Sequence, residues 1–286
     1  MHFVLISICC SVAVAVLLKY ARQTGVDTWQ MIVWNYPVAL VLTYFIFQPD
    51  LTKVTWSALP WRIYLPITVL LPGLFMLLSY SLRYAGLVQT EVAQRLSLVL
   101  SLLAAAFLFG EVFSAWRIAG ILVGFLAIAF LIGWRKGVSQ SQGSRYLLFP
   151  LLVFVGYGAI DVLFKTVALE VHVPYTTSLL LIFTGAFILA FTCFIVQCVF
   201  KKLHFSTKSM YWGGMLGALN FGNILFYMRA HQALVENPSV VFAGMNIGVI
   251  GVGALLGVLL FKEKLSRVNV FGIALAIIAV LMIAYF

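Results

Sequence analysis

Two stretches of the sequence match each other: Phe109-Gly110-Glu111…Trp116…Gly120-Ile121-Leu122-Val123-Gly124 and Phe261-Lys262-Glu263…Val268…Gly272-Ile273-Ala274-Leu275-Ala276. In both stretches a glycine follows the acid by nine residues, and a long apolar run comes next. A repeat of this kind indicates a duplicated chain. If each half crosses a membrane an odd number of times, the two halves lie inverted relative to one another, as in many secondary transporters.

Composition indicates a membrane protein. Of the 286 residues, 64% are hydrophobic and 9% are charged, whereas soluble domains carry roughly 25% charged residues. A helix needs about 20 apolar residues to cross a bilayer. We predict an all-α integral membrane protein with ten transmembrane helices, arranged as two inverted five-helix repeats. The predicted spans are 3–20, 29–47, 62–82, 85–108, 116–134, 146–169, 175–200, 209–231, 238–261 and 268–286.

A polar connector divides the predicted repeats. Residues 135–145 are rich in Gly, Ser and Gln, the composition of a flexible linker. We therefore assign residues 1–134 to a first five-helix repeat and residues 146–286 to a second.

The net charge of +10 is explained by the orientation of the protein in the membrane, and it does not require a nucleic-acid partner. Most of the 18 Lys and Arg residues lie in the loops after odd-numbered predicted spans. Because cytoplasmic loops are enriched in Lys and Arg, we predict that these loops are cytoplasmic and that both termini are outside.

No enzyme signature is present. His2, His172, His204 and His231 are scattered without metal-ligand spacing, and the sequence has no Walker loop, dinucleotide fingerprint or nucleophile elbow. The cysteines, Cys9, Cys10, Cys193 and Cys198, lie within predicted spans, where small apolar packing is their usual role. We predict that the chain is not an enzyme and holds no cofactor and no metal.

Arg95 is the strongest candidate for a binding residue. It lies near the middle of an apolar span, where a charge costs at least about 2.5 kcal/mol unless it is paired or hydrated. Glu91 precedes it by one helical turn, in the favourable order for an ion pair. The pair is either structural, or Arg95 offers its planar donors to an anionic group of a substrate. The repeat aligns Gln94 with Asn246, so both halves carry a polar side chain at this level.

Asp161 and Lys165 form a second acid–base pair one turn apart. Lys165 either extends to the membrane interface or faces a cavity. If the pair faces a cavity, Asp161 is a candidate proton carrier and Lys165 is its charged partner. Glu91 is a second candidate proton carrier.

Further polar residues lie within predicted spans. Asn220, Asn223 and Tyr227 share one helix face, and they either hydrogen-bond between helices or bind substrate. Trp34, Asn35 and Tyr157 either line a cavity or anchor span ends at the interface.

Glycines spaced four residues apart predict close helix contacts, because they let two backbones approach. The pairs are Gly120/Gly124, Gly213/Gly217, Gly244/Gly248 and Gly253/Gly257. Bending of predicted spans 4 and 9 is the alternative role.

The repeated acid-to-glycine stretches within two five-span halves resemble the drug/metabolite transporter superfamily, and within it the EamA-type permeases. The resemblance covers essentially the whole chain, although Lys262 replaces the glycine expected before the second acid. The resemblance implies a secondary carrier with a central cavity and alternating access. It also implies cytoplasmic termini, as is often the case in this family, whereas the distribution of Lys and Arg predicts that both termini are outside.

From these features we predict an inner-membrane, multi-pass transporter, a monomer or homodimer, that exports an amino acid or another small organic anion or zwitterion, with possible proton coupling. A multidrug or cation exporter is the first alternative. A channel would need a continuous polar lining, and a scaffold would need no charge at mid-membrane.

Overall fold

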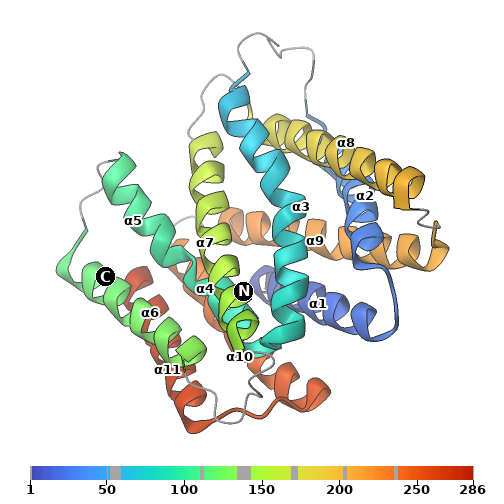
Figure 1. The fold of residues 1–286 in the computed structure, drawn as a ribbon. Helices are drawn as coiled ribbons and strands as arrows, with labels where there is room; N and C mark the ends of the chain where they lie inside the picture. The colour runs from blue at the N-terminus through green and yellow to red at the C-terminus, as the bar shows by residue number, and fades with distance from the viewer. Residues whose placement is uncertain are drawn as a thin grey trace. The chain divides into compact units, whose positions relative to one another are not determined.

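The computed structural model describes residues 2–49, 51, 59–109, 113–133, 143–168, 173–201, 205–234 and 238–285. The described residues form eleven α-helices and no strand (Figure 1). In chain order they are α1 (His2–Gln23), α2 (Thr28–Phe47), α3 (Trp61–Tyr84), α4 (Leu87–Leu96), α5 (Leu98–Phe109), α6 (Ala115–Gly133), α7 (Gly143–Ala168), α8 (Tyr175–Lys201), α9 (Thr207–Ala233), α10 (Pro238–Phe261) and α11 (Arg267–Tyr285).

The helices have the length and composition of a membrane protein. Eight apolar segments among the described residues are long enough to cross a membrane. They are His2–Gln23, Thr28–Phe47, Trp61–Tyr84, Leu87–Ala104, Leu147–Phe164, Tyr175–Phe200, Val241–Phe261 and Arg267–Tyr285. An all-helical membrane protein is therefore confirmed. The ten crossings, their inversion and their orientation stay predictions, since α6 offers a shorter apolar stretch and α9 is not among the eight.

The predicted span 85–108 corresponds to the apolar segment Leu87–Ala104, but this segment is not one continuous helix. The chain forms α4 and α5, with an interruption at Ser97. The Ser97 hydroxyl donates a 2.6 Å hydrogen bond to the Gln94 carbonyl. A serine that bonds the preceding turn competes with the helical ladder and bends it, and apolar periodicity does not register this local effect.

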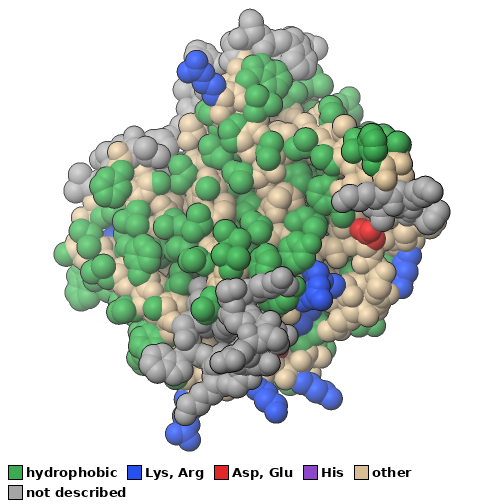
Figure 2. Space-filling model, viewed as in Figure 1, with side chains coloured by type: hydrophobic (Ala, Val, Ile, Leu, Met, Phe, Trp, Pro, Cys, Tyr) green, Lys and Arg blue, Asp and Glu red, His purple; other side chains and the backbone are tan. Residues whose placement is uncertain are grey.

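Large hydrophobic side chains cover much of the surface seen in Figure 2. Phe45, Phe107 and Phe200 are exposed by 68%, 85% and 81%. Water would penalise apolar surface of this extent, whereas lipid accommodates it, so this surface fits a bilayer.

The chain divides into two compact units. The first unit contains residues 1–16, 77–159 and 222–286, and the second contains 17–76 and 160–221. Each unit therefore combines segments from both predicted repeats. The predicted repeat boundary concerns the duplication of the sequence, and it stays a prediction.

Helices at corresponding positions of the predicted repeats pack together. In the first unit α4 packs on α10 and α6 packs on α11, and in the second unit α2 packs on α8. The green α6 and the red α11 run side by side in Figure 1. The core around α4 contains Val92, Ala93, Leu96, Ala127, Ile128, Phe154, Ile250, Ala276 and Ala279. This packing fixes α4, which carries the strongest candidate residue.

The predicted glycine contacts are confirmed. A Cβ on Gly217 of α9 would lie 2.5 Å from the backbone oxygen of Asn35 in α2. A Cβ on Gly120 of α6 would lie 3.0 Å from Ile283 of α11. Gly253 and Gly257 of α10 likewise face Glu91 and Val88 of α4. Glycine therefore allows these helices to approach more closely than any other residue would.

Candidate functional site

The candidate site lies along α4 in the first unit. This helix has ten residues and begins after Gly86, whose φ of 96° is left-handed and whose missing side chain leaves the helix without a local cap. Glu91 and Arg95 are one turn apart and project from the same face. The helix ends at Leu96, one residue after Arg95, before the interruption at Ser97.

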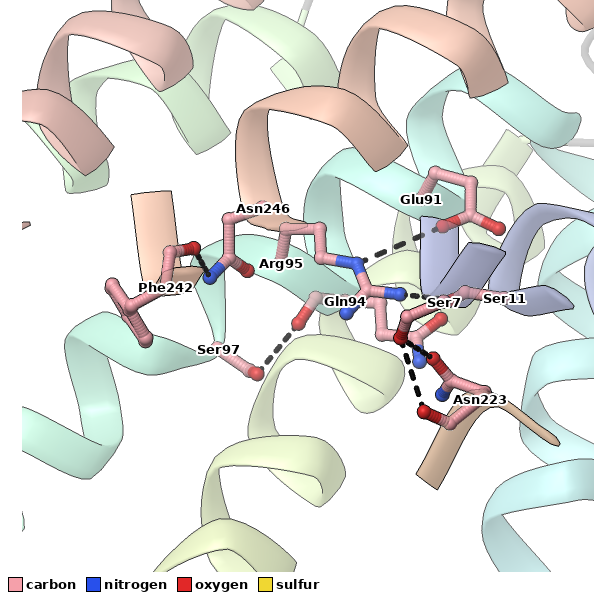
Figure 3. Close-up of polar contacts among 9 residues, drawn as sticks. All are labelled: Ser7, Ser11, Glu91, Gln94, Arg95, Ser97, Asn223, Phe242 and Asn246. Carbon is pink, nitrogen blue, oxygen red and sulfur yellow. Dashed lines mark hydrogen bonds and ion pairs between the residues drawn. The ribbon is translucent and has the colours of Figure 1, made fainter. Parts of the chain in front are cut away.

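Glu91 and Arg95 form a loose ion pair, as the sequence predicts. The distance from Arg95 Nε to Glu91 Oε2 is 4.0 Å, and the side chains are 14% and 1% exposed, respectively. Neither atom makes a hydrogen bond within the described part of the chain. Arg95 Nη2 donates a 2.5 Å hydrogen bond to Ser11 Oγ of α1 (Figure 3). The guanidinium thus keeps donor capacity that the described neighbours do not use.

α10 packs against the Glu91 side chain. A Cβ on Gly253 would lie 3.1 Å from Glu91 Cγ, so the bare backbone of α10 covers the stem of the carboxylate. An almost fully buried carboxylate with an unsatisfied oxygen is costly, so such a group in a native fold calls for a specific explanation, such as a functional role.

A second serine on α1, Ser7, extends the polar cluster of Glu91, Arg95 and Ser11. Ser7 is fully buried, and its hydroxyl lies 2.9 Å from Asn223 Oδ1 and 3.0 Å from the Asn223 carbonyl of α9. Ser7 and Ser11 lie one turn apart, and Figure 3 shows both beside Arg95 and Asn223. The sequence analysis missed both serines. Their only signal is that two small polar residues share a face of an otherwise apolar helix.

Two predicted residues make local backbone contacts. Asn246 is 8% exposed, and its Nδ2 donates a 2.9 Å hydrogen bond to the Phe242 carbonyl one turn earlier. The Gln94 carbonyl accepts the bond from Ser97 that marks the helix interruption. Both side chains lie on helices of the cluster, but the hydrogen bond of Asn246 lies within its own helix.

Tyr157 and Tyr227 also belong to the first unit and are half-buried. Tyr227 packs against the apolar cluster between α1 and α10 that includes Val4, Ile8 and Val249. The aromatic ring therefore has a packing contact close to Asn223 on α9.

The remaining predicted residues belong to the second unit, which is described by itself. Asn220 Nδ2 lies 3.4 Å from Asn35 Oδ1. Trp34 makes edge contacts with Phe191 and Phe205. Asp161 is exposed, and the side chain of Lys165 lies outside the described residues.

Residues 1–133 match the EamA-like transporter family. An "Uncharacterized protein" of Haemophilus influenzae (strain ATCC 51907 / DSM 11121 / KW20 / Rd) is 37% identical over 290 residues, which cover 100% of this chain and 98% of that protein. The chain belongs to the EamA-like transporter family. As a member of this family with many apolar helices, it is a multi-pass membrane protein of the transporter class.

A crystal structure of another protein has a similar fold. Its TM-score is 0.62 at 16% identity, and the match covers 98% of this chain and 96% of that one. This likeness concerns the fold alone.

Proposed function

We propose that this EamA-family protein is a secondary carrier that exports an amino acid or another small organic anion or zwitterion across the inner membrane. In this proposal two inverted repeats alternate access to a central cavity, and Arg95 binds the anionic group of the substrate.

Arg95 is the observation that carries the proposal. Its only hydrogen bond to a described residue is the one from Nη2 to Ser11 Oγ, and its ion pair with Glu91 is 4.0 Å long. A carboxylate can accept two parallel hydrogen bonds from a guanidinium. Glu91 does not make such a pair of bonds with Arg95, because its Oε2 lies 4.0 Å from Nε. A substrate carboxylate is therefore a better partner for Arg95 than Glu91 is.

The packing of corresponding helices supports the inverted repeats. The pairs α4–α10, α6–α11 and α2–α8 each join one helix from either predicted repeat. An axis relating two repeats would bring such pairs together at their interface.

Glu91 is the candidate for proton coupling. If a substrate carboxylate binds Arg95, two carboxylates share one guanidinium at a site where Glu91 is 1% exposed. Burying an uncompensated charge costs several kcal/mol, at about 3–5 kcal/mol for a broken buried pair. A proton on Glu91 removes that charge, so substrate and proton would bind together.

Export of a cation is the alternative, and one observation favours it. Oε2 of the buried Glu91 accepts no hydrogen bond from the described residues. A carboxylate released from Arg95 could bind a cationic substrate instead. In that case Glu91 would be the essential residue, and Arg95 would be replaceable.

The test is uptake of labelled compounds into proteoliposomes with and without a pH gradient. The panel contains the amino acids, small dicarboxylates and quaternary ammonium compounds. Wild type is compared with Arg95→Gln, Arg95→Lys and Glu91→Gln. We expect carboxylate-bearing compounds to move, Arg95→Gln to abolish uptake, Arg95→Lys to weaken it, and Glu91→Gln to remove the response to the pH gradient.

Arg229→Gln is the matched control, because Arg229 is exposed on α9 of the same unit. It should transport as wild type does. Normal uptake by a correctly reconstituted Arg95→Gln protein would refute the anion site, and uptake of ammonium compounds that depends on Glu91 alone would establish the alternative.

A further inference from the structure

The Glu263 carboxylate lies at the beginning of α4, 176 residues away in sequence from the helix that it contacts. Oε1 accepts a 2.5 Å hydrogen bond from the Leu87 amide, and Oε2 accepts a 3.1 Å bond from the Val88 amide. These are the first two amides of α4. Glu263 lies in the turn between α10 and α11.

Two glycines make room for this carboxylate. A Cβ on Gly86 would lie 2.7 Å from Glu263 Oε1, and a Cβ on Gly257 would lie 3.1 Å from Oε2. Any larger residue at either position would displace the acid from the helix. The pocket therefore fits a carboxylate between the end of α10 and the start of α4.

The backbone of the turn also holds Glu263 in place. Lys262 has a left-handed φ of 52° and turns the chain at the end of α10. The Glu263 amide then donates a 3.0 Å hydrogen bond to the Gly257 carbonyl. This backbone hydrogen bond holds Glu263 at the end of α10 and so positions its carboxylate for contact with α4.

A helix needs such a partner at its first turn. The first amides have no acceptor within the helix, the helix dipole favours a negative charge there, and Gly86 makes no side-chain cap. The first backbone bond to follow is from the Thr90 amide to the Gly86 carbonyl, at 3.3 Å. Glu263 therefore supplies the N-terminal cap that α4 cannot supply for itself.

We propose that Glu263 is a positioning residue for Arg95: by capping α4 from the α10–α11 turn, it sets where the helix starts and hence where the guanidinium lies relative to Ser11. The inference deepens the proposed function, because it rests on Arg95 as the substrate anchor. α4 is a ten-residue helix that starts at the cap and ends after Arg95. Contacts of Gly257 with Val88 and of Gly253 with Glu91 keep it on α10.

The first test is hydrogen exchange, followed by mass spectrometry, on the full-length protein in lipid nanodiscs. Glu263→Ala should raise the exchange of the Leu87 and Val88 amides about tenfold, since bonds to a charged group contribute at least about 1.4 kcal/mol, which is tenfold in an equilibrium. Asp27→Ala is the matched control, because Asp27 caps α2 through a 3.0 Å bond from the Gln30 amide, and alanine removes that acceptor. It should change exchange at the start of α2 only.

The second test measures the position of Arg95 without any substrate. Phenylglyoxal modifies accessible arginines, and mass spectrometry gives the rate at Arg95 relative to the exposed Arg229 in the same molecules. Glu263→Ala should raise this ratio at least threefold, and Asp27→Ala should leave it unchanged. Lys264→Gln, an exposed neighbour in the same turn, should leave both readouts unchanged.

If Glu263→Ala does not fold, Glu263→Gln serves instead, because it keeps one acceptor for Leu87 and loses the bond from Val88. Unchanged exchange at Leu87 and Val88 would overturn the cap. Raised exchange with an unchanged Arg95 ratio would overturn the positioning role. Neither readout involves transport, so a failure of the anion-carrier proposal is visible separately in the uptake assay.

Discussion

Glu91 Oε2 lies 4.0 Å from Arg95 Nε, one turn along the same helix, and neither atom hydrogen-bonds to a described residue. This distance is too long for a hydrogen bond, so Nε keeps an unused donor and Oε2 keeps unused acceptor capacity toward the described residues. The two charges hold one another in a buried site without saturating one another. In the proposed function, a substrate carboxylate takes the place of Glu91 as the partner of Arg95.

The first prediction concerns the stability of this pair. Arg95→Gln should cost about 3 kcal/mol of unfolding free energy, because it leaves Glu91 buried and unpaired. Glu91→Gln should cost less, since Arg95 is 14% exposed and keeps Ser11. The double variant should recover about 1–2 kcal/mol relative to the sum of the single changes. Denaturation in mixed micelles measures all three, and strict additivity would show that the groups do not interact.

The second prediction concerns Ser11. Ser11→Ala removes the hydrogen bond from Arg95 Nη2, and we expect KM for a carboxylate substrate to rise about fivefold with little change in maximal rate. The guanidinium loses a hydrogen-bond acceptor but keeps its charge, so in the proposed function substrate binding weakens more than the transport rate does. Thr184→Ala is the control, because its hydroxyl bonds only the Leu180 carbonyl of its own helix among the described partners. An unchanged KM for Ser11→Ala would separate Ser11 from the site.

The third prediction concerns Lys262. Its φ of 52° lies in the left-handed region, which costs a residue with a Cβ about 1–2 kcal/mol. Lys262→Gly should stabilise the protein by about 0.5 kcal/mol, since part of the relief is offset by the greater freedom of glycine in the unfolded chain. Gln48→Gly, at the end of α2 with a φ of 44°, should behave alike. A lower melting temperature for both variants would contradict this account.

The fourth prediction separates two glycines in similar sequence settings. A Cβ on Gly217 would lie 2.5 Å from the Asn35 backbone oxygen, whereas a Cβ on Gly251 meets nothing within 4 Å. Gly217→Ala should therefore destabilise the protein by about 1–3 kcal/mol. Gly251→Ala should be neutral or stabilising by up to about 1 kcal/mol, because alanine is the better helix former. Equal effects of the two changes on the melting temperature would contradict the close approach of α9 and α2.

Local pattern made several features predictable. Apolar runs predict helices because the backbone in lipid must satisfy its own hydrogen bonds. The four-residue spacing of Glu91 and Arg95 predicts their contact because α-helical geometry alone brings them together. The glycine pairs predict close helix contacts for the same reason: the spacing places both on one face, and the absence of a side chain allows approach.

The interruption at Ser97 and the local bond of Asn246 were not predictable from hydrophobic periodicity. Both result from a polar side chain that bonds the backbone of its own helix. Serine and asparagine adopt such bonds in some settings and not in others, and the neighbouring helices decide which.

The amino-acid sequence alone predicts a helical membrane protein with a duplicated acid-to-glycine stretch and a charged pair within one span, because composition and spacing act over a few residues. The contact of Ser11 with Arg95 across 84 residues and the capping of α4 by Glu263 across 176 residues became known from the folded chain. Such contacts depend on where the packing of whole helices brings distant side chains, and no local pattern contains that information. The repeat identifies Glu263 as a notable acid, whereas its contact with the first amides of α4 is known only from the fold.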